Sequence, residues 1–334
     1  MKKSSKKINC KICKNYLFNK FVVKLKNAPE SAQNFSLKKK QTKSRIELNV
    51  SQCSGCGLIQ ITNKPVGYYK KVIRAVGISK PMLNFRKKQF SEFCKKFKLK
   101  NKTIIEIGCG TGDYLNVMKK IIKKSHGLES SNKNYKECKK RKLKVFKGFI
   151  HNKNYKISKI KYDAFYILSF LEHIPKINEF LRGIYFNLKE NAVGIIEVPN
   201  FNMILEKKLY TEFIIDHLYY FTKDTLKLTL EYNGFEVIRT KEIWHKYIIS
   251  AIVRKKKQLE IKDLPSTIEK IQSELSNFIK KFPKNKIAIW GAGHQALTLI
   301  TLSKIEKKIK YIVDSAFFKQ NKFAPGSNLK IVSP

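Results

Sequence analysis

Arginine is scarce in this chain. Only seven of its 70 basic residues are arginine, and acidic residues number 25, so the formal net charge is +45. Arginine is the side chain that forks onto phosphates and guanine edges, whereas lysine is a hydrated point charge. The lysine excess therefore predicts solvated lysine-rich surfaces rather than a dedicated nucleic-acid site, and we expect no specific nucleic-acid partner.

Long apolar runs are also missing. The longest, near Tyr162 to Leu171, falls short of the roughly 20 residues that span a bilayer. The basic start, Met1 to Lys7, leads into polar sequence containing cysteine and does not resemble the core of a signal peptide. We therefore expect a soluble, cytoplasmic protein with no membrane partner. With 334 residues, 43% of them hydrophobic, the chain can bury the cores of about two or three domains.

Four of the seven cysteines form two close pairs. Cys10 and Cys13 make the first pair and Cys53 and Cys56 the second, with 39 residues between the pairs. Two such loops can bring four thiolates onto one tetrahedral ion, and Gly57 permits the turn that directs backbone amides at sulfur. In the expected reducing compartment a metal is favoured over disulfides. The pattern predicts a zinc ribbon with a long insertion, and four protein ligands would make the zinc structural.

A strand that runs into a glycine-rich turn opens the central part of the chain. Residues 103–107 form a mostly apolar run, and Gly108, Gly110 and Gly112 follow it at alternate positions. We expect a helix to begin near residue 114. Glycines let the backbone turn sharply and approach a ligand closely, while the helix N-terminus offers free amides.

A carboxylate at the end of the next strand specifies this site further. Glu129 stands seventeen residues past Gly112, where it can take both hydroxyls of a ribose. The site is therefore predicted to bind a nucleoside. Dinucleotide sites use Gly-x-Gly-x-x-Gly, whereas here the spacing is Glu-x-Gly-x-Gly-x-Gly, beginning at Glu106.

This spacing resembles motif I of the class I S-adenosylmethionine-dependent methyltransferases. Later segments agree in order with the remaining strands of that fold; they span residues 145–149, 162–174, 194–200, 234–237 and 247–253. The resemblance implies an α/β fold with a Rossmann-like core and S-adenosylmethionine as cofactor. The cofactor-binding residues that it implies are Glu106, Gly108, Gly110, Gly112, Glu129, Phe149 and Ser169.

Between the fifth strand and the final pair, a carboxylate stands beside an imidazole. Asp216 and His217 are followed by Tyr219, Tyr220 and Phe221. Such a grouping can remove a proton from carbon or oxygen near neutral pH. Adjacent residues of a strand point to opposite faces, so Asp216 and His217 can cooperate only if the backbone bends there.

The zinc-ribbon beginning, the methyltransferase core, the acid-His-Leu-x-Tyr-Phe segment and a Gly-Ala-Gly tail together resemble the nucleotide-sugar C-methyltransferases of deoxysugar pathways. The resemblance covers nearly the whole chain. It implies that Asp216 and His217 lie at the sugar, with the histidine or its neighbour as base, and that Tyr68 or Tyr69 approaches the sugar. The family usually has Glu where Asp216 stands and Tyr where Ile214 stands, so the base assignment stays open.

The reaction that we predict is C-methylation of a 4-keto nucleotide-linked deoxysugar through an enolate. Deprotonation beside the ketone gives a carbon nucleophile, so the enzyme has to position the substrate and remove a proton. His173, at the mouth of the fourth strand, is a candidate to hydrogen-bond the enolate oxygen. The candidates for the base are His217, Tyr68, Tyr69 and His173.

The tail contains a second strand-turn-helix pattern. An amphipathic helix is expected over residues 265–282, with Ile268, Ile271, Leu275, Phe278 and Phe282 on one face. A strand ending in Gly291-Ala292-Gly293 follows, and a later strand ends at Asp314. We predict an apparently incomplete Rossmann-like domain at 258–334, after a zinc-binding domain at 1–80 and a methyltransferase domain at 81–257.

Three other functions compete with this prediction. An O- or N-methyltransferase on a small molecule or sugar is the closest, because the same fold serves all three acceptor atoms. An RNA methyltransferase would use the positive charge, but Leu171-Glu172-His173 stands where a base-flipping motif would be expected. A scaffold without catalysis conflicts with the intact glycine loop and Glu129. For the oligomeric state we expect a monomer or a weak homo-oligomer.

Overall fold

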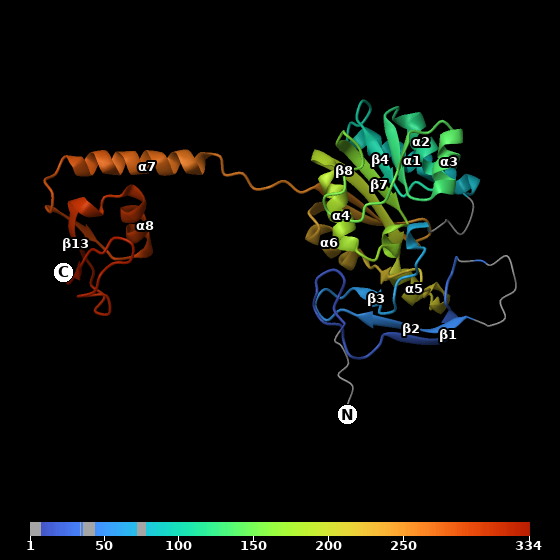
Figure 1. Ribbon diagram of the computed structural model, residues 1–334, viewed down its shortest axis with the longest axis horizontal. Helices are drawn as coiled ribbons and strands as arrows, with labels where there is room; N and C mark the ends of the chain where they lie inside the picture. Colours follow the sequence, from blue (N-terminus) through green and yellow to red (C-terminus); the bar gives the residue numbers. More distant parts are fainter. Residues whose placement is uncertain (1–7, 34, 36–43, 72–77) are drawn as a thin grey trace. The chain divides into compact units, whose positions relative to one another are not determined.

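A computed structural model describes residues 8–33, 35, 44–71 and 78–334 of the chain (Figure 1). The chain divides into two compact units, residues 1–257 and residues 258–334. Within the described residues, the first unit holds a seven-stranded and a four-stranded sheet, and the second unit holds a three-stranded sheet.

The seven-stranded sheet has the strand order β10-β11-β8-β7-β4-β5-β6. Its parallel strands are β4 (Ile104–Ile107), β5 (Ser125–Glu129), β6 (Val145–Lys147), β7 (Tyr162–Leu168) and β8 (Leu188–Pro199). At one edge β11 (Ile248–Lys255) runs antiparallel between β8 and β10 (Phe235–Ile243). The order reverses between β4 and β7, and ligands of open α/β sheets bind beyond the strand carboxyl ends at such a point.

Helices cover both faces of this sheet. They are α1 (Lys80–Lys96), α2 (Asp113–Ile121), α3 (Asn132–Lys140), α4 (Ile177–Phe186) and α6 (Lys223–Tyr232). Helix α5 (Phe201–Glu206) packs instead with the four-stranded sheet. Because strand side chains alternate between faces, Ala164 and Tyr166 of β7 pack with residues of α1 and α2. Phe165 and Ile167 pack on the opposite face with residues of α4 and α6. With both faces covered, every residue of β4 and β5 is buried.

The N-terminal part of the first unit is an antiparallel sheet of β1 (Val23–Pro29), β2 (Arg45–Gln52), β3 (Ile59–Ile61) and β9 (Tyr219–Tyr220). One cysteine pair precedes β1, and the other lies in the turn between β2 and β3. Strand β9 comes from the segment that carries Asp216 and His217, and it pairs Ile59 with Tyr220. This pairing ties the cysteine-containing part to the catalytic candidates.

Short 3₁₀ helices join several of these elements. In the first unit they are η1 (Tyr69–Lys71), η2 (Leu171–His173) and η3 (Tyr210–Glu212). Helix η2 follows β7 directly and therefore lies at the carboxyl end of the sheet.

The second unit has a parallel sheet of β12 (Ile287–Trp290), β13 (Ile309–Val313) and β14 (Ile331–Val332), with helices α7 (Asp263–Lys280), α8 (His294–Ser303) and η4 (Glu306–Lys308). Helix α7 packs into this core through Leu275 and Ile279, which are one turn apart. The other members of the predicted apolar face are exposed, namely Ile268, Ile271, Phe278 and Phe282. No helix in the described part of the chain is long and apolar enough to cross a membrane.

Candidate functional site

The glycine-rich turn leaves β4 in a conformation that favours glycine. Gly108, Gly110 and Gly112 have φ angles of 75°, 56° and 82°, in the left-handed region. At Gly108 an added Cβ atom would also lie 2.8 Å from the ring of Phe170. The loop can therefore approach a ligand only with these glycines in place.

Glu129, at the end of β5, is bound to this turn. Its Oε2 atom accepts a hydrogen bond from the Gly110 amide at 2.8 Å, and its Oε1 atom accepts one from Ser131 at 2.7 Å. Burial raises the pKa of Glu129, although these amides oppose the shift. The carboxylate thus stands where the sequence places a ribose-binding acid, beside the loop amides.

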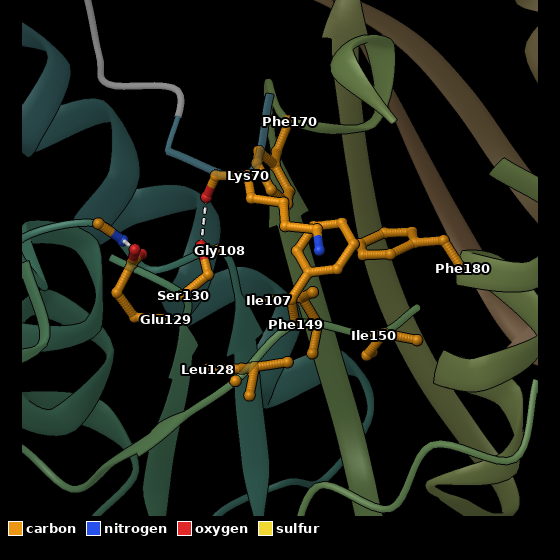
Figure 2. A pocket seen from close by; sticks show the side chains of 12 residues that line it. Lys70, Ile107, Gly108, Leu128, Glu129, Ser130, Phe149, Ile150, Phe170 and Phe180 are labelled. Atoms are coloured by element: carbon orange, nitrogen blue, oxygen red, sulfur yellow. Dashed lines mark hydrogen bonds between the residues drawn. The ribbon is translucent and has the colours of Figure 1, made fainter. Parts of the chain in front are cut away.

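A pocket opens between the turn and a group of aromatic rings (Figure 2). The ring of Phe180 lies 5.9 Å from that of Phe149 and 6.1 Å from that of Phe170. Lys70 reaches in from η1, with its Nζ atom 5.4 Å from the centre of the Phe149 ring. An acid at one side and aromatic faces at the other can hold the ribose and base of a nucleoside.

Four of the seven predicted cofactor residues line this cavity: Gly108, Gly110, Glu129 and Phe149. The other three are not among its lining residues. Glu106 is buried and accepts a hydrogen bond from the Tyr166 hydroxyl at 3.1 Å. Gly112 precedes α2, and the Ser169 amide donates to the Glu197 carbonyl at 2.9 Å in the turn after β7.

Sequence reasoning missed several lining residues. They are Lys70, Ile107, Leu128, Ser130, Gly148, Ile150, Phe170 and Phe180. Phe170 could have been predicted from its position directly after β7, because the carboxyl ends of parallel strands meet at one edge of the sheet, where ligands bind. Lys70 and Phe180 gave no such signal, since long-range packing brings η1 and α4 to the cavity.

A second cluster lies at the carboxyl end of β7. Glu172, His173 and His217 bring one ligand-type atom each to within 4.8 Å of one another. The two imidazole centres are 4.8 Å apart, and the Leu218 amide donates to the Glu172 carbonyl at 2.8 Å. The structure therefore brings both predicted histidines together and adds Glu172, which was not among the predicted site residues.

The imidazoles of this cluster are neutral. Burial lowers the pKa of His173 to about 4 and that of His217 to about 3. His173 Nδ1 lies 2.8 Å from the backbone oxygen of Asp216. None of the described residues forms a hydrogen bond with the imidazole of His217, which is half-buried. A neutral imidazole with a free nitrogen can accept a proton.

The Asp216 carboxylate interacts with residues other than His217. Its Oδ2 atom accepts a hydrogen bond from the Ala32 amide at 2.9 Å, and the hydroxyl of Tyr68 lies near Asp216. The pKa of Tyr68 is raised by burial and by this acid. Asp216 therefore contributes its backbone oxygen to His173, and its side chain binds the Ala32 amide near Tyr68.

The structure separates the two tyrosines that the sequence left as alternatives. Tyr68 lies against Asp216, whereas the ring of Tyr69 packs edge-on against Phe149 at 5.8 Å. Tyr68 is thus next to the catalytic candidates, and Tyr69 is next to the cofactor cavity.

The four N-terminal cysteines converge. The sulfurs of Cys10 and Cys56 are 3.7 Å apart, those of Cys13 and Cys53 are 3.4 Å apart, and all four lie within 4.8 Å. A tetrahedral zinc with bonds of about 2.3 Å needs sulfurs about 3.8 Å apart. Amides of Ile12, Gly55 and Cys56 also donate to cysteine sulfurs. The cluster is compatible with a zinc ion.

Comparison with known families agrees with this geometry. Residues 82–240 match the family described as methyltransferase domain, and residues 254–334 match the family described as C-methyltransferase C-terminal domain. No curated protein matches the chain significantly.

Solved methyltransferase structures are similar to about half of the chain. An S-adenosylmethionine-dependent methyltransferase from Clostridium acetobutylicum is 15% identical with a TM-score of 0.44, over 57% of this chain and 96% of that one. Magnesium protoporphyrin IX methyltransferase from Synechocystis is 13% identical with a TM-score of 0.43, over 56% and 93%. A possible histamine N-methyltransferase from Thermotoga maritima is 19% identical with a TM-score of 0.41, over 52% and 91%.

The chain is an S-adenosylmethionine-dependent methyltransferase with the class I Rossmann-like α/β fold. Its second unit lies within the segment that matches the family described as C-methyltransferase C-terminal domain. The predicted fold class and enzyme class are confirmed.

Proposed function

We propose that this enzyme methylates a carbon atom beside the keto group of a nucleotide-linked deoxysugar. The observation that carries the proposal is the neutral, half-buried imidazole of His217, which has no hydrogen-bond partner among the described residues and lies beside His173. Carbon acceptors need a base, because a C–H bond must break before carbon becomes nucleophilic. The match to the C-methyltransferase C-terminal domain supports carbon as the acceptor.

The cofactor cavity would hold S-adenosylmethionine through three kinds of contact. Glu129 would accept from the ribose hydroxyls, the Gly108 and Gly110 backbone would lie along the ligand, and Phe149 would face the base. When bound, S-adenosylmethionine supplies a methyl group already activated by its positive sulfur.

His217 then takes a proton from the substrate carbon, and the electron pair of the broken C–H bond forms the enolate. The enolate carbon would accept the methyl group that bound S-adenosylmethionine supplies, and the electron pair of the broken methyl–sulfur bond would stay on sulfur. The ketone is restored in this step. Because His217 is half-buried, its proton can leave to solvent. Tyr68, whose hydroxyl lies near Asp216, is the alternative proton-transfer group.

We further propose that Cys10, Cys13, Cys53 and Cys56 hold one structural zinc. Four sulfur ligands leave no position for substrate, so the ion would hold the N-terminal sheet in place rather than activate a carbonyl. The sulfur spacing supports this proposal.

Mapping the transferred methyl group tests the acceptor atom. The enzyme is incubated with ¹³C-methyl-labelled S-adenosylmethionine and a panel of nucleoside-diphosphate 4-keto sugars, and the product is examined by NMR. We expect the label on a carbon beside the ketone. Label on oxygen or nitrogen would support the rival small-molecule methyltransferase, and label transferred to added RNA would support the RNA enzyme.

A further inference from the structure

Glu172 is a buried carboxyl, and one of its two oxygens has no hydrogen-bond partner among the described residues. It is 1% exposed, and its Oε2 atom is buried with no hydrogen-bond partner in the described part of the chain. Its Oε1 atom lies 3.9 Å from Nε2 of His173, which is beyond hydrogen-bond distance. Buried polar atoms of native proteins are nearly always satisfied, so this carboxyl calls for an explanation.

The hydrogen bond of His173 fixes which of its nitrogens carries a proton. Nδ1 lies 2.8 Å from the backbone oxygen of Asp216, and a carbonyl oxygen can only accept. Nδ1 must therefore carry a proton. In a neutral imidazole the other nitrogen, Nε2, then has a lone pair, and this nitrogen is the one that faces Glu172.

A lone pair and an ionised carboxylate repel each other, so one proton has to lie between them. We propose that Glu172 is a positioning residue, held as a neutral carboxylic acid, whose hydroxyl donates to Nε2 of His173. An approach of about 1 Å would bring the two groups to hydrogen-bond distance. The inference rests on the proposed function because it gives Glu172 a part in the same imidazole pair.

The groups that face Glu172 carry no positive charge to stabilise its ionised form. They are His173 on η2, His217 before β9 and Tyr247 before β11. Tyr247 donates to Glu212 at 3.0 Å. No lysine or arginine of the described residues forms an ion pair with Glu172, and burial raises the pKa of its carboxyl to about 8.

A neutral Glu172 suits the chemistry of an enolate. The enolate develops negative charge close to the imidazole pair, and a carboxylate at this place would repel that charge in a poorly screened interior. The neutral acid avoids the repulsion and holds the ring of His173 in one orientation. Ionisation of Glu172 should therefore slow the reaction, even though the imidazoles stay neutral.

Infrared difference spectroscopy on the enzyme without substrate tests the protonation directly. The spectrum of the wild type at pH 7 should contain a protonated-carboxyl band that Glu172→Gln removes and that titrates with a midpoint near pH 8. Glu92→Gln, an exposed position on α1, should leave the band unchanged. Absence of the band at pH 7, or its persistence in Glu172→Gln, would overturn the proposal.

The pH dependence of turnover gives the second readout. Glutamine keeps an N–H donor and stays neutral, so Glu172→Gln should keep turnover within about tenfold at pH 7 and lose the decline near pH 8. A loss equal to that of His217→Ala at every pH, or bound metal that disappears with Glu172→Gln, would overturn the proposal. If Glu172→Gln fails to fold, the wild-type band is compared with that of Glu129→Gln, which removes the other described carboxyl with a raised pKa and should leave the band in place; loss of the band in Glu129→Gln would overturn the proposal. The infrared test needs no substrate, so it stands whether or not the acceptor is a keto sugar.

Discussion

Ile59 pairs with Tyr220 across two antiparallel strands, so the strand after the second cysteine pair is bonded to the segment that carries His217. A second link runs from Ile12, whose carbonyl accepts from Asn178 of α4 at 2.8 Å. The cysteine-containing part is therefore built into the catalytic unit rather than attached as a separate module. An ion held by the four cysteines would influence catalysis through the position of His217.

The zinc proposal predicts near-stoichiometric zinc in the purified protein. Cys10→Ser should lose most of this zinc and also lower turnover, because β3 would no longer hold β9 firmly. Metal analysis and activity measurements check both effects. Cys94→Ser, at a buried cysteine of α1 outside the cluster, is the control that should keep its zinc. A metal-free wild type would remove the proposal.

Glu129→Ala should weaken the binding of S-adenosylmethionine by about 10- to 100-fold, since hydrogen bonds to a charged group contribute about 1.5–3 kcal/mol. The side chain also accepts from Gly110, so part of the loss will come from a less ordered loop. Calorimetric titration measures the affinity, and Glu92→Ala at an exposed position of α1 serves as the control. Unchanged affinity in a folded Glu129→Ala protein contradicts the assigned cofactor site.

The two tyrosines before residue 70 should differ in their effects. Tyr68→Phe removes the hydroxyl beside Asp216 and should lower kcat with little change in cofactor affinity. Tyr69→Phe keeps the ring on Phe149 and should leave kcat near the wild-type value. Steady-state kinetics on the matched pair checks this split. Equal kcat losses in both variants would contradict the separation of their roles.

His173, His217 and Glu172 together should give the free energy of unfolding a maximum near pH 6.5. The lowered pKa values of His173 and His217 give stability that is present above about 6.5 and lost as pH falls through 4 and 3. The raised pKa of Glu172 gives stability that is present below about 4.5 and lost as pH rises to about 8.

Between pH 6.5 and 8 only Glu172 of these three groups titrates differently in the folded and unfolded states. The wild type should therefore lose on the order of 2 kcal/mol over this range, and Glu172→Gln should not. Urea unfolding at the two pH values measures the difference. Parallel pH dependence in the two proteins would contradict the burial-raised pKa of Glu172.

Local patterns predicted the parts of the fold that depend on neighbouring residues. The glycine turn and Glu129 were found because a strand, a tight turn and a strand end leave a short-range signature. The pairing of β3 with β9, the entry of Lys70 into the cavity and the burial of Glu172 depend on contacts between distant segments. The burial of the predicted apolar face of α7 was overestimated. Helical periodicity shows which residues share a face, but not whether another element covers that face.

The central claim is that His217 forms the enolate, and hydrogen exchange tests it most directly. The enzyme, a 4-keto nucleotide sugar and a cofactor analogue without a transferable methyl group are incubated in D₂O, and NMR follows the carbon beside the ketone. The wild type and the exposed-histidine control His245→Ala should both exchange. His217→Ala should bind cofactor normally, lose exchange and reduce turnover by roughly 10² to 10⁴. Exchange retained in His217→Ala, or absent from the wild type, would contradict the account.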